Sequence, residues 1–186
     1  HIHIARAERH VHYPAKFQLI VAMNPCKCGK FLDKDRNCTL APKCASNYLA
    51  KISGPILDRI DIQISVNQQN FSLIKFNEQA ESSAEVKKRI VSARKKQQER
   101  YNNYLFNYNC DLPLQEALAE ILDQETQILL DKISKNYSLS IRGTTKLIRV
   151  ARTIADLDCE DKINKKHIYE SLSYKIGFNN ALRTKP

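Results

Sequence analysis

An arginine flanked by two aspartates is the residue of this chain best suited to phosphate chemistry. Arg59 stands between Asp58 and Asp61 in the stretch Ser53–Asp61. Its guanidinium stays charged and presents a planar fork of N–H donors that matches phosphate oxygens. The alternative is a surface ion pair with Asp58 or Asp61, and composition alone favours that alternative.

The elements on either side of Arg59 determine where it would lie. Gly54-Pro55 ends the preceding segment and allows a short helix to begin at Pro55. From Ile60 to Val66 apolar residues alternate with polar ones, and this alternation predicts a β-strand. We therefore expect Arg59 on a connecting turn, directly before a strand.

Asn24 is the second candidate, because it closes the apolar run Phe17–Pro25. Such a run predicts a fully buried strand of a parallel sheet covered on both faces. Ligands of open α/β sheets bind at the carboxyl ends of the strands, which is where Asn24 would lie. An asparagine amide can donate to a γ-phosphate oxygen while accepting from an attacking water. An Asx turn begun by Asn-Pro is the other interpretation, and it is compatible with this role.

With a third segment, residues 139–157, these stretches resemble the ComM/YifB branch of the magnesium-chelatase-like AAA+ ATPases. In that family the sensor 1 strand ends in A-M-N-P, the arginine finger lies in S-G-P-x-L-D-R-x-D, and a lid signature follows. The resemblance extends from about Ala5 to Ile176. It implies that Asn24 is sensor 1, that Arg59 is an arginine finger acting in trans, and that Arg142 is sensor 2. The alternative for Arg142 is an ion pair inside a helical bundle.

The resemblance also implies an activity for the full-length protein. It would bind ATP and Mg and assemble into a hexameric ring. It would act as a DNA motor of the ComM type, which serves branch migration in natural transformation. Two alternatives remain open: a magnesium-chelatase-like motor subunit, and a non-catalytic, zinc-stabilised nucleic-acid-binding module.

Two motifs that such an ATPase needs do not occur in the sequence. There is no G-x-x-x-x-G-K-[ST] loop to cradle phosphates, no strand ending in paired acids to hold Mg, and only 4 glycines in all. On the family interpretation the chain is a carboxyl-terminal part, cut after the Walker A and Walker B motifs. We therefore expect no ATP hydrolysis by this chain alone.

Four cysteines lie close together in the sequence, at Cys26, Cys28, Cys38 and Cys44. Four thiolates can close around one zinc ion and hold a charged loop without an apolar core. The C-x-C spacing departs from the usual C-x-x-C knuckle, and the second pair is more widely spaced than in the family. The alternative is a set of reduced cytosolic thiols.

Residues 1–13 alternate in a way that predicts a β-hairpin with its turn near Ala5 to Glu8. In the related motors such a hairpin precedes sensor 1 and contacts DNA in the central channel. Arg6 and Arg9 near the turn are the residues that would make this contact. A solvated basic turn is the alternative.

The fold class predicted is a partial α/β AAA+ core, with parallel-sheet strands and a hairpin, followed by an all-α lid domain. Residues 1–68 form the core part, with the cysteine-rich insert at 26–44. Residues 69–104 form a linker and a basic helix, which begins at a capping box formed by Ser82 and Glu85. Residues 105–186 form the helical lid.

Charge and hydropathy limit the partners. The net charge of +10 suits a polyanion, either nucleotide or nucleic acid. No apolar run approaches the length of a membrane span, and no signal-peptide pattern begins the chain. These features predict a cytoplasmic protein without a membrane partner.

Overall fold

The computed structural model describes residues 1–6, 9–24, 26–29, 40, 43–66, 81–120 and 123–183. The chain divides into two compact units, His1–Leu49 and Ala50–Pro186. The predicted linker lies mostly outside the described residues, because these stop at residue 66 and resume at residue 81.

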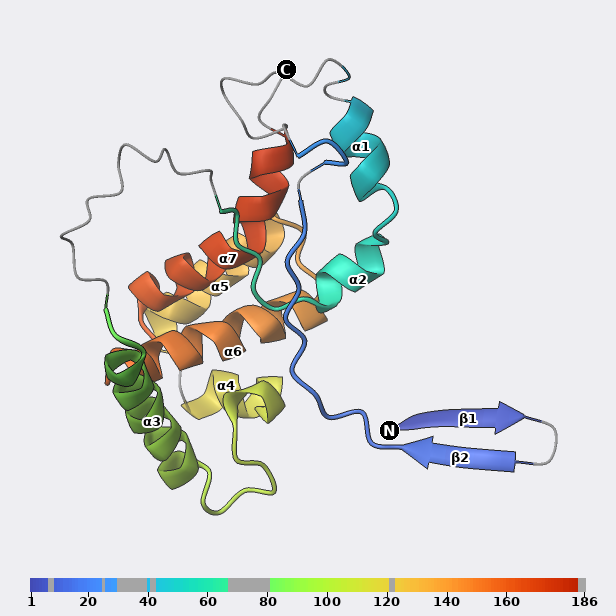
Figure 1. Ribbon diagram of the computed structural model, residues 1–186. Helices are drawn as coiled ribbons and strands as arrows, with labels where there is room; N and C mark the ends of the chain where they lie inside the picture. The colour runs from blue at the N-terminus through green and yellow to red at the C-terminus, as the bar shows by residue number, and fades with distance from the viewer. Residues whose placement is uncertain are drawn as a thin grey trace. The chain divides into compact units, whose positions relative to one another are not determined.

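The first unit contains the predicted hairpin. Strand β1 (Ile2–Arg6) pairs with β2 (Arg9–Tyr13) in an antiparallel sheet. The register places Ile2 opposite Tyr13 and Arg6 opposite Arg9, which confirms the hairpin and puts both arginines at its turn end (Figure 1). A short helix, α1 (Lys43–Leu49), ends this unit.

The parallel strands predicted from the apolar runs are not formed. Residues 14–24 and 60–66 carry no strand, and the only sheet in the described part of the chain is the β1–β2 pair. The side chains expected to be buried are open to solvent: Phe17 is 74% exposed, Ile20 84% and Val66 83%. A strand needs hydrogen-bonded neighbours, and the described chain offers none to these segments. The hydropathy pattern indicated that these residues suit a β-strand. It carries no information on whether a neighbouring strand is present to pair with them.

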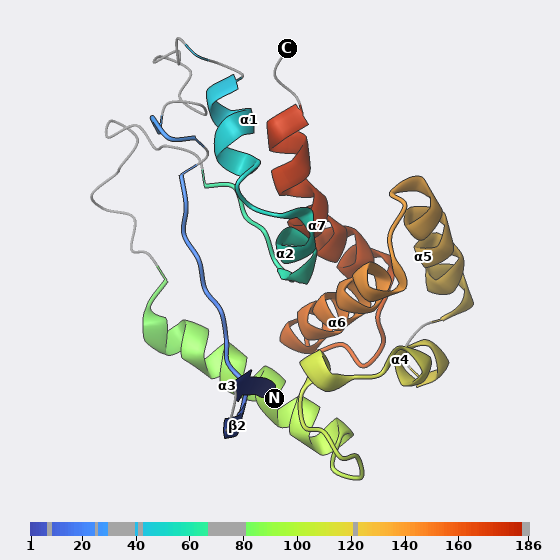
Figure 2. The same cartoon turned by 90° about the vertical axis from the view of Figure 1, so that its right-hand side faces the viewer.

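The second unit is helical. It contains α2 (Gly54–Arg59), α3 (Ser83–Arg100), the 3₁₀ turn η2 (Asn109–Asp111), α4 (Leu114–Glu120), α5 (Gln124–Asn136), α6 (Ile141–Leu157) and α7 (Lys165–Arg183). Helix α6 is central, because α3, η2, α4 and α7 all pack against it, while α5 packs against α7 (Figures 1 and 2). The helical character predicted for residues 105–186 is confirmed where the structure describes them. None of the helices described here has the length and apolar composition that a bilayer span requires.

Local sequence signals set where these helices begin. The capping box predicted at Ser82 and Glu85 is present, with both reciprocal hydrogen bonds. Asp123 caps α5 by accepting from the Thr126 N–H, and Ser140 caps α6 by accepting from the Gly143 N–H.

The core of the bundle forms around the apolar stripe of α6. Leu147, Ile148 and Ala151 of that helix are buried against residues from the surrounding segments: Tyr101, Leu112, Ala117, Leu130, Ile133, Ile163, Ile168 and Leu172. The apolar residues of α6 recur with the 3.6-residue period of a helix, so they form one stripe, which is the buried face of the central helix.

Candidate functional site

Arg59 lies in the last turn of α2 and is exposed. Ser53 is the N-cap residue, in extended conformation, and Pro55 occupies the first turn, as the Gly-Pro signal predicted. The Arg59 guanidinium donates from Nη1 to the Pro55 carbonyl at 2.8 Å. It forms no ion pair with any described residue, so the interpretation of a salt bridge with Asp58 or Asp61 is wrong.

Those two aspartates instead bind lysines of the central bundle. The Asp61 carboxylate lies 3.0 Å from Nζ of Lys146 on α6, and the Asp58 carboxylate lies 3.6 Å from Nζ of Lys175 on α7. Lys146 also donates to the carbonyl of Arg59 itself. The two lysines therefore attach α2 to the bundle, and neither aspartate pairs with the Arg59 guanidinium.

A backbone contact continues this attachment beyond α2. The Gln63 N–H donates to the Tyr174 carbonyl at 2.9 Å, and the Gln63 side chain donates back to the Leu57 carbonyl at 3.0 Å. The segment predicted as a strand is thus attached at one point to α7 and does not belong to a sheet.

Arg142 lies in the first turn of α6 and is also exposed. It has no ion pair among the residues that the structure describes, so the alternative of a pair inside the bundle is not found. Arg142 precedes Lys146 by four residues, and residues at this spacing share one face of a helix. The face that carries Arg142 therefore also carries the lysine that holds Arg59.

Asn24 is exposed and follows a segment without regular secondary structure. It belongs to the first compact unit, whereas Arg59 and Arg142 belong to the second. Its predicted position at the carboxyl end of a buried strand is not formed, for the reason given above: the described residues supply no neighbouring strand.

Arg6 and Arg9 face each other across the end of the hairpin and are exposed. Like charges directly opposite each other on a sheet repel, so this pair weakens the hairpin in isolation. The two arginines also concentrate positive charge at the tip of the hairpin. A bound phosphate would reduce the repulsion between them.

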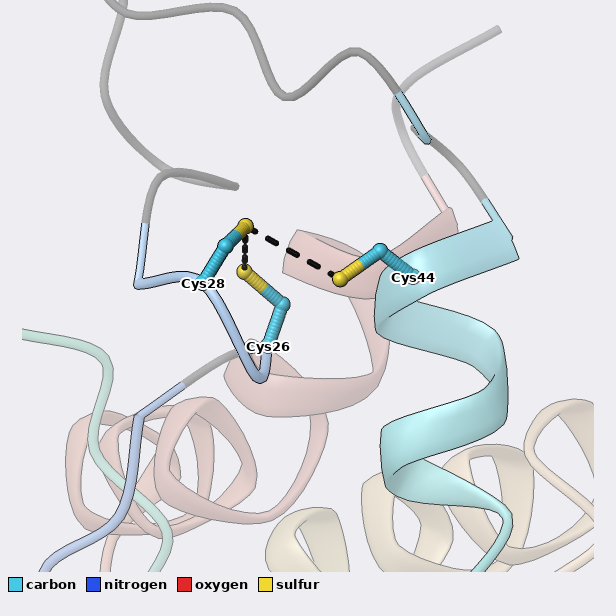
Figure 3. Close-up of side chains that lie close together, drawn as sticks. All are labelled: Cys26, Cys28 and Cys44. Carbon is cyan, nitrogen blue, oxygen red and sulfur yellow. Dashed lines mark hydrogen bonds between the residues drawn. The ribbon is translucent and has the colours of Figure 1, made fainter.

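Three of the four predicted cysteine ligands come together (Figure 3). The Sγ atoms of Cys26 and Cys28 lie 3.2 Å apart, and those of Cys28 and Cys44 lie 3.8 Å apart. All three sulfur atoms lie within 4.8 Å of one another. Cys38, the fourth predicted ligand, lies outside the described residues.

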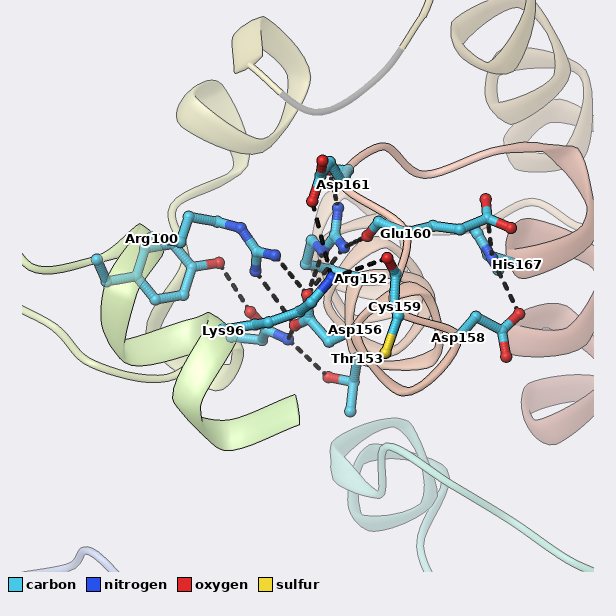
Figure 4. A network of polar contacts seen from close by, with 12 residues as sticks. Lys96, Arg100, Arg152, Thr153, Asp156, Asp158, Cys159, Glu160, Asp161 and His167 are labelled. Carbon is cyan, nitrogen blue, oxygen red and sulfur yellow. Dashed lines mark hydrogen bonds and ion pairs between the residues drawn. The ribbon is translucent and has the colours of Figure 1, made fainter. Parts of the chain in front are cut away.

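A buried charge network in the helical unit was not predicted from the sequence (Figure 4). Asp156 of α6 is fully buried and accepts from Arg152 Nη2 at 2.8 Å, from Asn109 Nδ2 at 2.8 Å and from Arg100. The network joins α3, η2 and α6. Its signal in the sequence was an arginine and an aspartate four residues apart, within an otherwise apolar stripe.

The surroundings of this network shift the pKa values of its two arginines in opposite directions. Burial lowers the pKa of the Arg152 guanidinium, and the Asp156 carboxylate opposes that shift. For Arg100, burial also acts to lower the pKa, but hydrogen bonding to Asp156 raises it overall. The Asp156 carboxylate therefore compensates two guanidinium groups at once and connects α3, η2 and α6.

In a second group of possible metal ligands, a lysine ammonium group already pairs with the carboxylates. Asp158 and Glu160 lie within reach of the buried His167, whose Nδ1 accepts from the Asn164 N–H (Figure 4). The Lys166 ammonium is 2.9 Å from the Asp158 carboxylate and 2.7 Å from that of Glu160. Hydrogen bonding to Lys166 holds the pKa of Asp158 below its usual range. This group therefore closes the α6–α7 turn by ion pairing.

Comparison with known proteins identifies the family. The family described as "Magnesium chelatase, subunit ChlI" matches residues 1–74, and "Magnesium chelatase, subunit ChlI C-terminal" matches residues 80–175. The second match alone covers more than half of the chain. The chain therefore belongs to the magnesium chelatase ChlI family, as the resemblance stated from its motifs had indicated.

Its relatives include two named bacterial proteins. YifB of Escherichia coli, described as uncharacterised, is 37% identical over 175 residues, which are 94% of this chain and 34% of YifB. The competence protein ComM of Haemophilus influenzae is 33% identical over 176 residues, which are 92% of this chain and 33% of ComM. An uncharacterised protein of Mycobacterium tuberculosis is 29% identical over 175 residues. The chain thus spans about a third of the length of the curated relatives it matches.

Proposed function

We propose that this chain is the sensor and arginine-finger part of an AAA+ ATPase that works as a DNA motor in a hexameric ring. Arg59 would enter the ATP site of a neighbouring subunit and stabilise negative charge on the transferring phosphoryl group. Arg142 would contact the γ-phosphate, and Asn24 would orient the attacking water. In the complete ring, ATP would be bound together with Mg.

The observation that carries this proposal is the state of the two arginines. Both are exposed, and both lack an ion pair among the described residues; for Arg59 this holds although Asp58 and Asp61 lie close in the sequence. The aspartates beside Arg59 are paired with Lys146 and Lys175 instead. A guanidinium that has no carboxylate partner can donate its N–H groups to a phosphate.

The arrangement of the finger helix supports a shared task for Arg59 and Arg142. Lys146 contacts the Arg59 carbonyl and lies one helical turn after Arg142. A movement of the first turns of α6 would therefore also move α2. The sequence has no phosphate-cradling loop of its own, so both arginines would meet a nucleotide that is held elsewhere.

The exposed apolar run supports a completed sheet in the full-length protein. Leu19, Val21 and Met23 are 58%, 64% and 39% exposed, next to the more exposed Phe17 and Ile20. A contiguous apolar stretch of this kind marks a surface that another element covers. We propose that strands of the AAA+ core pair with it and thereby place Asn24 at a strand end.

A DNA partner is supported by the hairpin and by the relatives. Arg6 and Arg9 concentrate positive charge at the hairpin tip, and the chain as a whole carries a net charge of +10. One relative bears the name competence protein ComM. On this basis we propose that the hairpin contacts DNA phosphates and that the motor acts in branch migration.

The test is ATP hydrolysis by the full-length protein, with and without branched DNA. Replacing Arg59 by alanine should lower turnover by about 10³–10⁵ while ATP binding is kept. Replacing Arg142 by alanine should lower turnover by about 10²–10³, the usual effect of removing one charge-stabilising donor. Arg89→Ala is the matched control, because Arg89 is an exposed arginine of α3 that pairs with Glu81. Equal turnover in Arg59→Ala and Arg89→Ala would refute the finger role.

The same assay also tests whether the 186-residue chain hydrolyses ATP alone and whether DNA is the partner of the full-length protein. The 186-residue chain by itself should show no ATP hydrolysis, since it has no phosphate-binding loop. DNA should stimulate the full-length protein, and Arg6→Ala together with Arg9→Ala should reduce that stimulation without changing the basal rate.

A second candidate function is favoured by the family description, which names magnesium chelatase. In that case ATP hydrolysis would drive metal insertion into a porphyrin. Hydrolysis that is indifferent to DNA, but lost in Arg59→Ala, would favour this chelatase-type motor over the DNA motor.

A further inference from the structure

The strongest feature that the ATPase proposal leaves unused is the thiol cluster formed by Cys26, Cys28 and Cys44. Its sulfur atoms come from two segments, because Cys28 and Cys44 are separated by 16 residues in the sequence. Figure 3 shows the three thiols pointing toward a common centre, two from one turn and one from α1. Cys26 is fully buried, although little else in the described part of this unit is.

The backbone fixes the geometry of the first two thiols. The Gly29 N–H donates to the Cys26 carbonyl at 3.1 Å and closes a turn. Gly29 adopts a left-handed conformation with φ of +73°, which glycine reaches without steric cost. This turn folds Cys28 back toward Cys26, and the C-x-C spacing therefore places both sulfur atoms on the same side.

The third thiol is delivered by the first turn of α1. The Cys44 N–H donates to the Leu40 carbonyl at 2.9 Å, which anchors the start of that helix. Two sulfur atoms bound to one tetrahedral zinc lie about 3.8 Å apart, because each Zn–S bond is about 2.3 Å. The separation between Cys28 and Cys44 is 3.8 Å. Cys26 and Cys28 are closer, at 3.2 Å, and would move slightly apart on binding.

Weak thiol–thiol contacts do not explain why these segments meet. Thiols are poor hydrogen-bond donors and acceptors. In the described residues of this unit the only other buried apolar side chain is Ala45, so there is little core to hold the turn against α1. A structural metal supplies that missing folding energy in small, core-poor segments.

We propose that Cys26, Cys28 and Cys44 bind one zinc ion as three thiolates, and that this ion joins the Cys26–Gly29 turn to α1. Thiolates are the ligands that select zinc among the common divalent ions, and the fourth position of the tetrahedron is open to a further donor. The proposal stands independently of the ATPase function. It has one consequence for it, since Cys26 follows Asn24 by two residues and zinc would restrain the chain at that point.

The experiment is metal analysis of the 186-residue chain, purified without chelator and with reductant removed at the end. We expect about one zinc per chain, and a loss to below about a fifth of that in Cys26→Ser and in Cys44→Ser. Cys110→Ser is the matched control, because Cys110 is an exposed, unpaired thiol of the helical unit. It should keep the full zinc content.

A measurement on the unmodified chain guards against variants that fail to fold. Replacing zinc by cobalt should produce thiolate-to-cobalt charge-transfer absorption together with the strong visible bands of a tetrahedral site. Zinc well below one per chain, with all 6 cysteines reactive toward a thiol reagent, would overturn the proposal. If no metal is found and two of the six thiols do not react, the proposal is wrong and a disulfide is present instead. If iron and inorganic sulfide are found, the proposal is wrong and the site holds an iron–sulfur cluster.

Discussion

Replacing Asp156 by asparagine should remove the one negative charge that compensates two guanidinium groups in the helical bundle. Arg152 is 0% exposed, so its charge cannot be rehydrated without moving a helix, whereas the Arg100 side chain is 21% exposed and already reaches solvent. Breaking one partner of a buried ion pair costs about 3–5 kcal/mol, because an uncompensated charge remains. Arg152 keeps the Asp161 and Glu160 carbonyls as acceptors. We therefore expect the lower end of that range, about 3 kcal/mol.

Urea unfolding of the 186-residue chain, followed by circular dichroism, measures this loss. With a slope of about 1–3 kcal/mol per molar, the midpoint should fall by about 1–3 M while the slope is unchanged. Asp61→Asn is the control, because the Asp61 side chain is 61% exposed and its ion pair among the described residues is with Lys146. It should cost less than about 1 kcal/mol. Equal losses in the two variants would show that the Asp156 network is solvated and would refute the argument.

Two other predictions concern helix attachment and pH. Lys146→Met removes the contacts of α6 with the Arg59 carbonyl and with Asp61. Hydrogen exchange of the α2 amides should then quicken by about tenfold, since a hydrogen bond to a charged group contributes about 1.5–3 kcal/mol. Lys95→Met, which loses only an exposed pair with Glu99 at 3.9 Å, should leave α2 unchanged, and equal exchange in both variants would contradict the anchoring role. Hydrogen bonds from the Ser82 N–H and hydroxyl hold the pKa of Glu85 below its usual range, so its capping contribution is complete at neutral pH and is lost as pH falls through the folded value. The stability difference between the chain and Glu85→Ala should therefore shrink below about pH 4, and a difference independent of pH would contradict this.

The helices show how far local sequence signals reach. Ser82, Asp123 and Ser140 each satisfy orphan N–H groups of the first turn, so the start of each helix depends on residues within the same turn. The buried stripe of α6 follows from a 3.6-residue period in the same way. Such features could be predicted because their physical cause lies within a few residues of the chain.

The ion pairs of the candidate site could not be predicted from local sequence. The Asp-x-x-Asp surroundings of Arg59 favoured a local ion pair, yet both aspartates pair with lysines of α6 and α7. Pairing of this kind depends on which helices lie beside α2, and neighbouring sequence does not contain that information. The motifs nevertheless selected Arg59 and Arg142, because the residue types that bind phosphate are recognisable without their surroundings.

By itself the sequence determined the start of α3, the hairpin and the family, since capping, alternation and motif order are all encoded along the chain. Only the tertiary structure decided which charges are free and which are paired. It buried Arg152 and Asp156 together, brought the Cys44 thiol to those of Cys26 and Cys28, and left the apolar run before Asn24 exposed. The physical reason is the same in each case. An ion pair, a metal site and a strand all need a partner from a distant part of the chain or beyond it, and the partner's position is a property of the fold.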